Sequence, residues 1–261
     1  MAYVFDIRLI ARLTLAFCGA LAAGIATADH HESGAVEDSP TVLITGANRG
    51  LGLEFARQYA ASGWSVIGTA RRPAQASDLN ALDVDVMPLD VTDKDSISAL
   101  AAALGERKVD LLINNAGIFP MARTLESVDA YDYAQTLMVN TLGPVLVTQA
   151  LLPNLRQGDL KRIVNITSQL GSIERSNGGF YGYRESKAAL NMFTRTLAGE
   201  LGPEGFVCLV VHPGWARTDM GGPSATQSAE EAVTGMRSVI DNLTADDNGG
   251  FIGFDGESVA W

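Results

Sequence analysis

The fold is decided by the sequence TVLITGANRGLG at residues 41–52. Its first five residues are β-branched or leucine, which is typical of a buried strand. Gly46, Gly50 and Gly52 follow, and helical patterning begins at Leu51. Glycine lets backbone N–H groups approach an anion closely, and the positive end of a helix attracts that anion. This strand, glycine turn and helix therefore predict a binding site for the pyrophosphate of a dinucleotide.

Strands and helices alternate along the rest of the chain. Such alternation favours parallel strands in one sheet with helices on both faces. We therefore predict an α/β fold with a single-domain, doubly wound parallel sheet of about seven strands, of the Rossmann type. Ligands of such sheets bind beyond the carboxyl ends of the strands. Further strands are expected at residues 65–70, 84–89, 109–114, 162–167, 206–212 and 251–254, and helices at 51–61, 95–104, 130–155 (kinked at Gly143-Pro144), 182–201 and 229–243.

The N-terminal segment differs from the rest of the chain. Residues 1–28 have a basic start, with Arg8 and Arg12, then a short apolar run and the small residues Ala26-Thr27-Ala28. This pattern predicts a cleaved secretory signal peptide, and hence a secreted or periplasmic protein. The alternative is an uncleaved N-terminal segment that anchors the protein in a membrane.

Composition excludes some functions. The chain has 261 residues and a formal net charge of −11, whereas nucleic-acid binding needs a basic face, so no nucleic-acid partner is expected. Cys208 is the only cysteine beyond residue 28, which excludes an internal disulfide in the mature chain. Residues 29–39 are polar and acidic and predict a flexible leader. His30 and His31 belong to this leader, and no metal site is predicted.

Arginines after the second predicted strand bear on the choice of dinucleotide. An acidic residue there would bind a ribose 2′-hydroxyl, whereas a basic residue would bind a 2′-phosphate. This chain has Arg71 and Arg72 at that point and no carboxylate, and Arg49 lies within the glycine turn. Two arginines on one phosphate make a strong, charge-assisted site. We therefore predict NADP(H) rather than NAD(H), bound by Arg49 and Arg71, with Arg72 as the alternative.

A tyrosine and a lysine provide the candidate acid–base pair. Tyr183 and Lys187 are four residues apart in a helical pattern, so they share one face of the helix. A free phenol has a pKa of about 10, and a nearby ammonium is expected to lower it toward the range of useful proton transfer. Tyr181 is six residues from Lys187 and would not share its face.

Several further motifs follow one another in a characteristic order. They are Thr45-Gly46-x-x-x-Gly50-x-Gly52, Asp90-Val91, Asn114-Asn115-Ala116-Gly117, Asn140, Ser168, Tyr183-x-x-x-Lys187, and Pro213-Gly214 with Thr218. Over residues 41–261 this order resembles the short-chain dehydrogenase/reductase family. Residues 211–235 and the ending at 253–261 are similar to its C-factor-like and carbonyl-reductase-like branch. The resemblance assigns residues 40–261 to one domain of this family.

The resemblance also implies roles for individual residues. Tyr183 would be the acid–base group, Ser168 would hold and polarise the substrate oxygen, and Asn140 would fix a water that connects Lys187 to solvent. Lys187 would also bind the nicotinamide ribose. The remaining cofactor contacts implied are Gly46, Arg49, Gly50, Leu51, Gly52, Arg71, Asp90, Val91, Asn115, Ala116, Gly117, Tyr183, Pro213, Gly214 and Thr218.

The implied function is an NADP(H)-dependent oxidoreductase that interconverts the carbonyl and the alcohol of a small molecule. The alternative is a nicotinamide-cofactor-binding regulatory or signalling protein of the C-factor type with little turnover. The family implies a homodimer or homotetramer. The loop at 215–227 is rich in glycine, serine and threonine and is expected to move as a lid, and the loop at 173–180 is expected to shape the substrate site.

Overall fold

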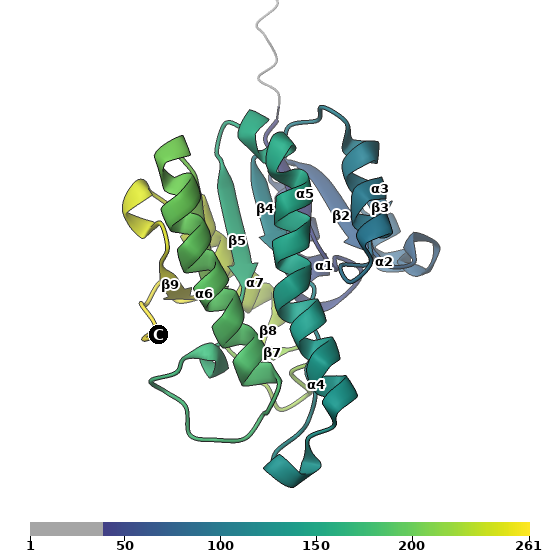
Figure 1. Ribbon diagram of the computed structural model, residues 1–261. Coiled ribbons are helices and arrows are strands. Elements are labelled where there is room, and N and C mark those ends of the chain that lie inside the picture. The colour runs from purple at the N-terminus through teal and green to yellow at the C-terminus, as the bar shows by residue number, and fades with distance from the viewer. Residues whose placement is uncertain (1–38) are drawn as a thin grey trace, which may run out of the picture. The chain divides into compact units, whose positions relative to one another are not determined.

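The computed structural model describes residues 39–261, so the predicted signal peptide or anchor and nearly all of the predicted leader lie outside the described residues. Seven parallel strands form the central sheet in the order β3-β2-β1-β4-β5-β6-β9 (Figure 1). Strands are added on both sides of β1, which confirms the predicted doubly wound sheet. The strands are β1 (Thr41–Ile44), β2 (Ser65–Ala70), β3 (Asp85–Pro88), β4 (Leu111–Asn114), β5 (Arg162–Ile166), β6 (Val207–His212) and β9 (Phe251–Gly253).

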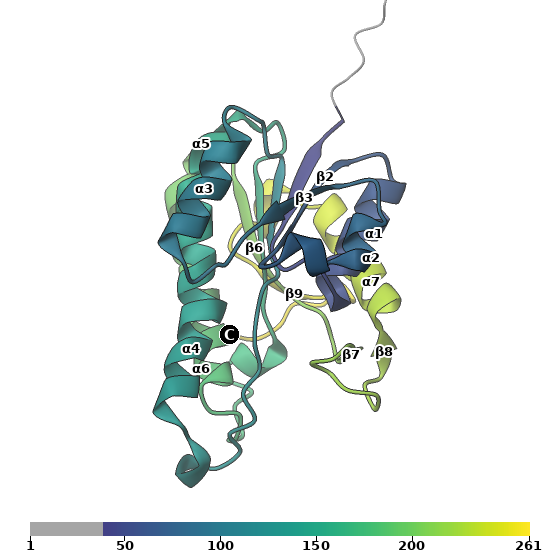
Figure 2. The ribbon, with the colours of Figure 1, turned by 90° about the vertical axis from the view of Figure 1, so that its right-hand side faces the viewer.

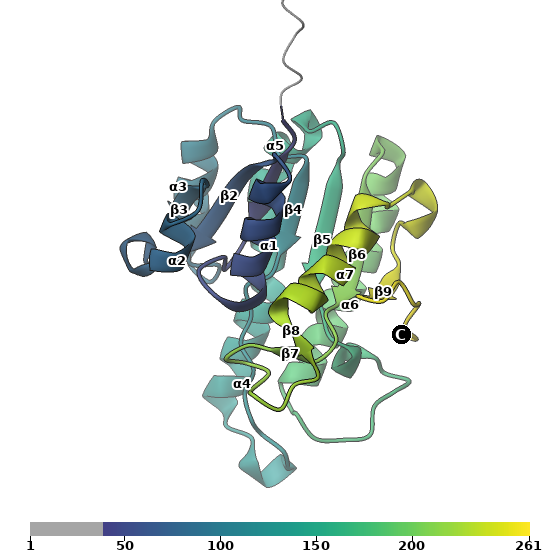
Figure 3. The same cartoon turned by 180° about the vertical axis from the view of Figure 1, so that it is seen from behind.

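Helices cover both faces of this sheet. Figure 2 shows the sheet edge-on between two helical layers, and Figure 3 shows the second layer from its own side. One layer contains α3 (Lys94–Leu104), α5 (Gly143–Gln157) and α6 (Tyr183–Leu201), and the other contains α1 (Gly50–Ala61), α7 (Ala229–Asp241) and the short α2 (Ser77–Asn80).

Each strand contributes to two cores because its side chains alternate between the faces of the sheet. In β1, Val42 and Ile44 pack with α1 and α7, whereas Leu43 packs with α3 and α5, and all three are fully buried. The near-continuous apolar sequence of β1 follows from this burial on both faces.

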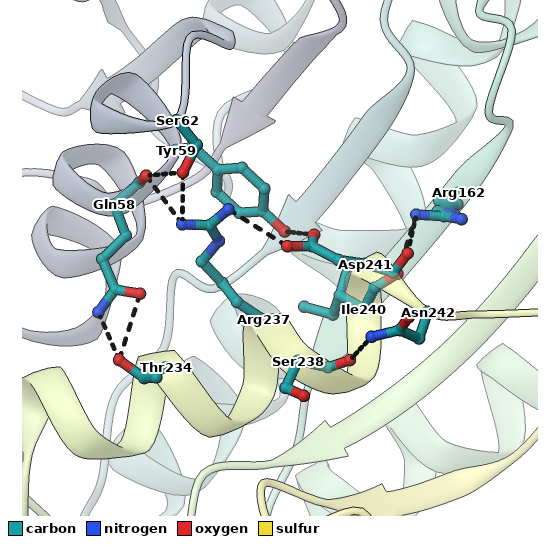
Figure 4. A network of polar contacts seen from close by, with 10 residues as sticks. All are labelled: Gln58, Tyr59, Ser62, Arg162, Thr234, Arg237, Ser238, Ile240, Asp241 and Asn242. Carbon is teal, nitrogen blue, oxygen red and sulfur yellow. Dashed lines mark hydrogen bonds and ion pairs between the residues drawn. The ribbon is translucent and has the colours of Figure 1, made fainter.

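A polar network joins α1 to α7 (Figure 4). The guanidinium of Arg237 donates to the backbone oxygen of Gln58 at 2.8 Å and to Asp241 at 3.2 Å, and it lies 4.3 Å from the ring centroid of Tyr59. The Tyr59 hydroxyl donates to Asp241 at 3.1 Å, and burial raises the pKa of this phenol. The network fixes α7 beside α1, the helix that begins at the glycine turn.

The long predicted helix at 130–155 is divided differently from our expectation. It consists of α4 (Ala130–Leu137), a π-helical turn over Met138–Leu142, and α5, so the irregularity lies before Gly143-Pro144. Pro144 has no N–H to donate to the carbonyl of Asn140, and its ring would crowd that carbonyl. A wider turn relieves this conflict, and the N–H of Gly143 donates to Met138 instead.

The stretch Ala130–Gln157 is the one helix among residues 39–261 with the length and composition of a membrane span. However, Val147, Leu151 and Leu155 have no exposed surface and pack against the sheet. Such burial is typical of a core helix in a globular domain.

Candidate active site

The glycine turn lies at the carboxyl end of β1 and is hydrogen-bonded to the residues that follow β4. The Thr45 hydroxyl accepts the N–H groups of Asn115 and Ala116, both at 3.0 Å. The Asn115 side-chain amide donates to the backbone oxygens of Thr45 at 2.9 Å and Gly46 at 3.1 Å. Four hydrogen bonds therefore join the turn directly to the Asn-Asn-Ala-Gly motif.

Glycine is needed in this turn for both backbone conformation and space. Gly46 and Gly50 have φ of +66° and +56°, which disfavour any side chain. A Cβ at Gly52 would overlap the Gly46 carbonyl and the Asn115 amide. Within residues 39–261 no side chain caps the start of α1, so its first N–H groups are available to an anion. The turn fits the pyrophosphate that we predicted for it.

Each arginine of the predicted phosphate-binding pair has a carboxylate neighbour. Arg49 forms an ion pair with Asp219, from the loop after β6, with Nη1 2.9 Å from Oδ2. Arg71 follows β2 and lies near Asp90. Partial burial acts to raise the pKa of Asp90, but hydrogen bonds from Thr92 and the charge of Arg71 hold it below its usual range.

Val91, for which the family resemblance implies a cofactor contact, is buried. Its side chain is 8% exposed, and a Cβ at Gly143 would lie 3.0 Å from it. Val91 therefore packs under α5, which leaves mainly its backbone for the adenine contact that the family resemblance implies.

Tyr183 and Lys187 lie together at the beginning of α6, as their spacing predicts. Both are buried, and the Lys187 Nζ lies 5.8 Å from the centroid of the Tyr183 ring. The ammonium donates to the backbone oxygen of Ile166, at the end of β5, at 2.8 Å. Burial lowers the pKa of Lys187 to about 8.

The pKa of Tyr183 differs from our expectation. We expected Lys187 to lower it, whereas burial raises it to about 12, and only Ser168 opposes the rise. Desolvation of the phenolate outweighs a cation that lies over the ring and is itself bound to Ile166. The phenol is therefore protonated at neutral pH.

Ser168 begins the short helical turn Gln169–Gly171 after β5. Its Oγ accepts the N–H of Leu170 at 3.1 Å and is close enough to the Tyr183 phenol to lower its pKa. A Cβ at Gly171 would lie 2.8 Å from the Cβ of Lys187, so the turn packs directly on α6. The structure thus brings Ser168, Tyr183 and Lys187 together at the carboxyl edge of the sheet.

Asn140 is fully buried in the π-helical turn beside the same group. Its side-chain oxygen accepts from the N–H of Ile118 at 2.9 Å, and its amide donates to the Ile118 oxygen at 2.9 Å and to Ser186 at 3.1 Å. A Cβ at Gly117 would lie 3.2 Å from this Asn140 oxygen and 3.8 Å from Lys187 Nζ. The Asn140 amide therefore connects the 117–118 segment to α6.

The loop after β6 reaches back over the glycine turn. The His212 Nδ1 accepts the N–H of Gly214 at 3.1 Å, and burial lowers the pKa of His212 to about 4, so the ring is a neutral acceptor at pH 7. A Cβ at Gly50 would meet the Thr218 methyl at 3.4 Å. The loop that carries Pro213, Gly214 and Thr218 thus contacts the glycine turn through Thr218.

This loop, which we expect to move as a lid, contains regular structure. Two short parallel strands, β7 (Ala216–Arg217) and β8 (Gln227–Ser228), pair across it, and the indole of Trp215 donates to Gly221 at 2.8 Å. A strand of two residues is too short to give an alternating pattern, so the sequence did not reveal it.

Two aromatic residues next to Tyr183 were not foreseen. Phe119 packs edge-on against Tyr183, with ring centroids 4.5 Å apart, and Phe180 lies 5.3 Å from Phe119. The Arg123 guanidinium lies 4.1 Å from the Phe180 centroid. The position of Phe119, two residues after Gly117, was the available signal. Among residues 39–261 no group of three or more His, Cys, Asp or Glu side chains could hold a metal ion.

Comparison with known proteins identifies the family to which this sequence is similar. A model of the short chain dehydrogenase family matches residues 40–229. The C-signal protein of Myxococcus xanthus is 50% identical over 154 residues, which are 59% of this chain and 93% of that protein. The 1-hydroxy-2-glutathionyl-2-methyl-3-butene dehydrogenase of Rhodococcus sp. (strain AD45) is 34% identical over 85% of this chain and 99% of its own length.

A solved structure is similar as well. The NADPH-bound carbonyl reductase from chicken fatty liver has a TM-score of 0.80 and 37% identity, and the match covers 85% of this chain and 99% of that one. Together these similarities confirm the resemblance that the ordered motifs indicated.

Proposed function

The chain belongs to the short-chain dehydrogenase family, and we propose that it is an NADP(H)-dependent oxidoreductase that interconverts a carbonyl compound and an alcohol. The proposal depends chiefly on one observation: a buried Tyr183 adjoins Ser168 and has the Lys187 ammonium 5.8 Å from its ring centroid, at the carboxyl edge of the sheet. A buried phenol with two polar neighbours and an adjoining dinucleotide cradle suits proton exchange coupled to hydride transfer.

The residues present fit a dinucleotide. Gly46 and Gly50 have positive φ, a Cβ at Gly52 would overlap the Gly46 carbonyl and the Asn115 amide, and the start of α1 is uncapped. Arg49 and Arg71 would bind the 2′-phosphate. The NADPH bound in the solved relative supports NADP(H) as the cofactor. When bound, NADP(H) supplies or accepts the hydride at its nicotinamide ring.

Two side chains contact the substrate oxygen in this proposal, and Lys187 exchanges protons with the site. In reduction, the Tyr183 hydroxyl donates its proton to the carbonyl oxygen, and in oxidation it accepts the proton of the alcohol. The Ser168 hydroxyl binds the same oxygen and orients it. A pKa of about 12 keeps the phenol protonated at neutral pH, which is the form that donates a proton in reduction. Lys187, with a pKa of about 8, can exchange protons with the site near neutral pH.

Nicotinamide absorbance tests the proposal with purified protein. NADPH and NADH are offered with a panel of ketones, aldehydes and quinones, and we expect oxidation of NADPH with at least one of them. Tyr183→Phe should lower kcat by about 100-fold or more, the usual contribution of a general acid. Tyr181→Phe, the matched control two residues away, should change kcat by less than about threefold, because its phenol does not adjoin Lys187.

A regulatory protein with little turnover is the second candidate. It is favoured by the 50% identity with the C-signal protein, over most of that protein's length. This candidate predicts tight NADPH binding, no turnover on the whole panel, and no effect of Tyr183→Phe. Any NADPH-dependent turnover that Tyr183→Phe abolishes would reject it.

The site of action is a separate proposal. The basic start and apolar run of residues 1–28 support export, with cleavage after Ala28. Sequencing the N-terminus of the protein from fractionated cells tests this. A mature chain that begins near Asp29 outside the cytoplasm is expected, and an intact N-terminus in the membrane fraction would favour the anchor instead.

A further inference from the structure

We propose that Asn191 is a positioning residue that holds Ser168 against Tyr183. The proposal rests on the function proposed above, because it concerns the serine that would bind the substrate oxygen. Asn191 itself is one helical turn beyond Lys187 and two beyond Tyr183, on the same face of α6.

Asn191 bonds to both ends of the turn that carries Ser168. Its Oδ1 accepts the hydroxyl of Thr167 at 2.6 Å, and its Nδ2 donates to the backbone oxygen of Gly171 at 3.3 Å. Thr167 immediately precedes Ser168, and Gly171 closes the turn. Asn191 is 3% exposed and Thr167 is 2% exposed, so these bonds are shielded from water.

The bonds within the turn do not place it relative to α6. The N–H of Gly171 donates to the Ser168 oxygen at 2.9 Å, and the N–H of Leu170 donates to the Ser168 Oγ at 3.1 Å, so both stay inside the turn. Arg184 makes one bond from α6, to the Leu170 oxygen at 3.2 Å. Arg184 is partly exposed and also bonds to Gly179 and Asn177. Lys187, also on α6 and buried, bonds to the Ile166 oxygen, which precedes the turn. Among the described residues Asn191 is the buried side chain of α6 that bonds at both ends of the turn.

Small shifts of this turn matter because Ser168 must reach an oxygen that Tyr183 also reaches. A misplacement of about 1 Å in a reacting group can lower a rate by about 100-fold. Loss of the Thr167 hydroxyl would leave the Asn191 oxygen buried and unpaired, which favours rearrangement of the side chain. The turn would then lose one of its two attachments at Asn191.

A neighbouring pair offers a matched control. Asn165 donates to the hydroxyl of Thr194 at 2.8 Å, also between β5 and α6, and both residues are fully buried. This pair lies one turn further along α6 and does not touch the Ser168 turn. Thr194→Val and Thr167→Val each remove one buried hydroxyl. Thr194→Val also loses a bond to the Leu190 oxygen at 2.9 Å, so it should destabilise the domain at least as much as Thr167→Val.

The test combines these variants with Ser168→Ala in a double-mutant cycle, with NADPH and phenanthrenequinone as the probe. Thr167→Val and Asn191→Leu should each lower kcat by about tenfold, with KM and the Kd of NADPH within about twofold of the original values. Thr167→Ser, which keeps the hydroxyl, should restore kcat. In the Ser168→Ala background the same changes should lower kcat by less than about twofold, since the effect acts through Ser168. Equal losses in both backgrounds, or an equal loss in Thr194→Val, would overturn the proposal.

A second measurement needs no turnover. Amide hydrogen exchange at Leu170 and Gly171, in the protein without cofactor, should accelerate in Thr167→Val and not in Thr194→Val. If Ser168→Ala has unchanged kcat, the proposed role of Ser168 fails, whereas the exchange result still decides whether Asn191 holds the turn. Unchanged exchange in Thr167→Val and Asn191→Leu would reject the positioning role on its own.

Discussion

Arg49 and Asp219 connect two loops that are 170 residues apart in the chain, with Nη1 and Oδ2 separated by 2.9 Å. Arg49 belongs to the glycine turn after β1, and Asp219 to the loop after β6. Both side chains are largely exposed, at 69% and 77%, so the ion pair itself contributes little stability. The ion pair matters for cofactor binding instead, because Arg49 is also the arginine that we propose to bind the 2′-phosphate of NADP(H).

We expect Asp219→Asn to tighten NADPH binding. Arg49 would no longer have to leave a carboxylate before it meets the phosphate. Since an exposed ion pair contributes at most about 1 kcal/mol, Kd should fall by about two- to fivefold. NADH, which has no 2′-phosphate, should bind with unchanged affinity. Fluorescence titration measures both values. Asp159→Asn makes the same charge change at the exposed partner of Lys108 and should leave both affinities unaltered.

Arg71→Asp should weaken NADPH binding much more than NADH binding. The reversed charge would repel the 2′-phosphate and would add to the negative charge of Asp90, which Arg71 now neutralises in part. We expect about a tenfold or greater loss for NADPH, since charge-assisted bonds to phosphate are strong. Lys108→Asp is the control, because it reverses a charge just before β4, near the amino end of that strand and away from the predicted cofactor site. Equal weakening of both cofactors by Arg71→Asp would reject the phosphate assignment.

Gly52→Ala should destabilise the domain by about 1–3 kcal/mol, because the added Cβ would overlap backbone at Gly46 and the amide of Asn115. Denaturant unfolding monitored by circular dichroism measures the change. Gly199→Ala is the matched control, since a Cβ there meets nothing within 4 Å and the residue lies inside α6. This second change should stabilise the domain by about 0.5–1 kcal/mol. A Gly52→Ala protein as stable as the original would contradict the tight packing of the turn.

Lys187 should make stability rise between pH 8 and 10. Its pKa falls from 10.5 to about 8 on folding, so between these values the unfolded chain holds the extra proton. The resulting destabilisation is fully present below pH 8 and is relieved as pH rises toward 10.5. Over that range the free energy of unfolding should rise by up to about 3 kcal/mol relative to Lys187→Met.

Urea unfolding at several pH values measures this difference. Lys94→Met removes an exposed lysine at the beginning of α3 and should show no such trend. Measurements should stop at pH 10, because the raised pKa of Tyr183, about 12, makes stability fall with pH above the ordinary value of 10. A constant difference between the original protein and Lys187→Met from pH 7 to 10 would show that Lys187 is not desolvated.

The sequence by itself determined the sheet, its glycine turn and the shared helix face of Tyr183 and Lys187, the proposed acid–base pair. These features depend on short-range information: alternation in strands, periodicity in helices, and glycines at a strand–helix junction. Residues 41–52 were sufficient for the turn, and the four-residue spacing was sufficient to place Tyr183 and Lys187 on one face. The motif order then named the family.

Only the tertiary structure decided how these residues influence one another. The reversed pKa shift of Tyr183 depends on burial, and burial depends on what packs around a residue rather than on its neighbours in the chain. The Arg49–Asp219 pair and the bonds of Asn191 join segments whose distance is set by strand order and helix packing. The π-helical turn at Met138–Leu142 also depends on tertiary packing. Pro144 determines which backbone hydrogen bond of the helix is lost, but packing determines which turn of the helix widens.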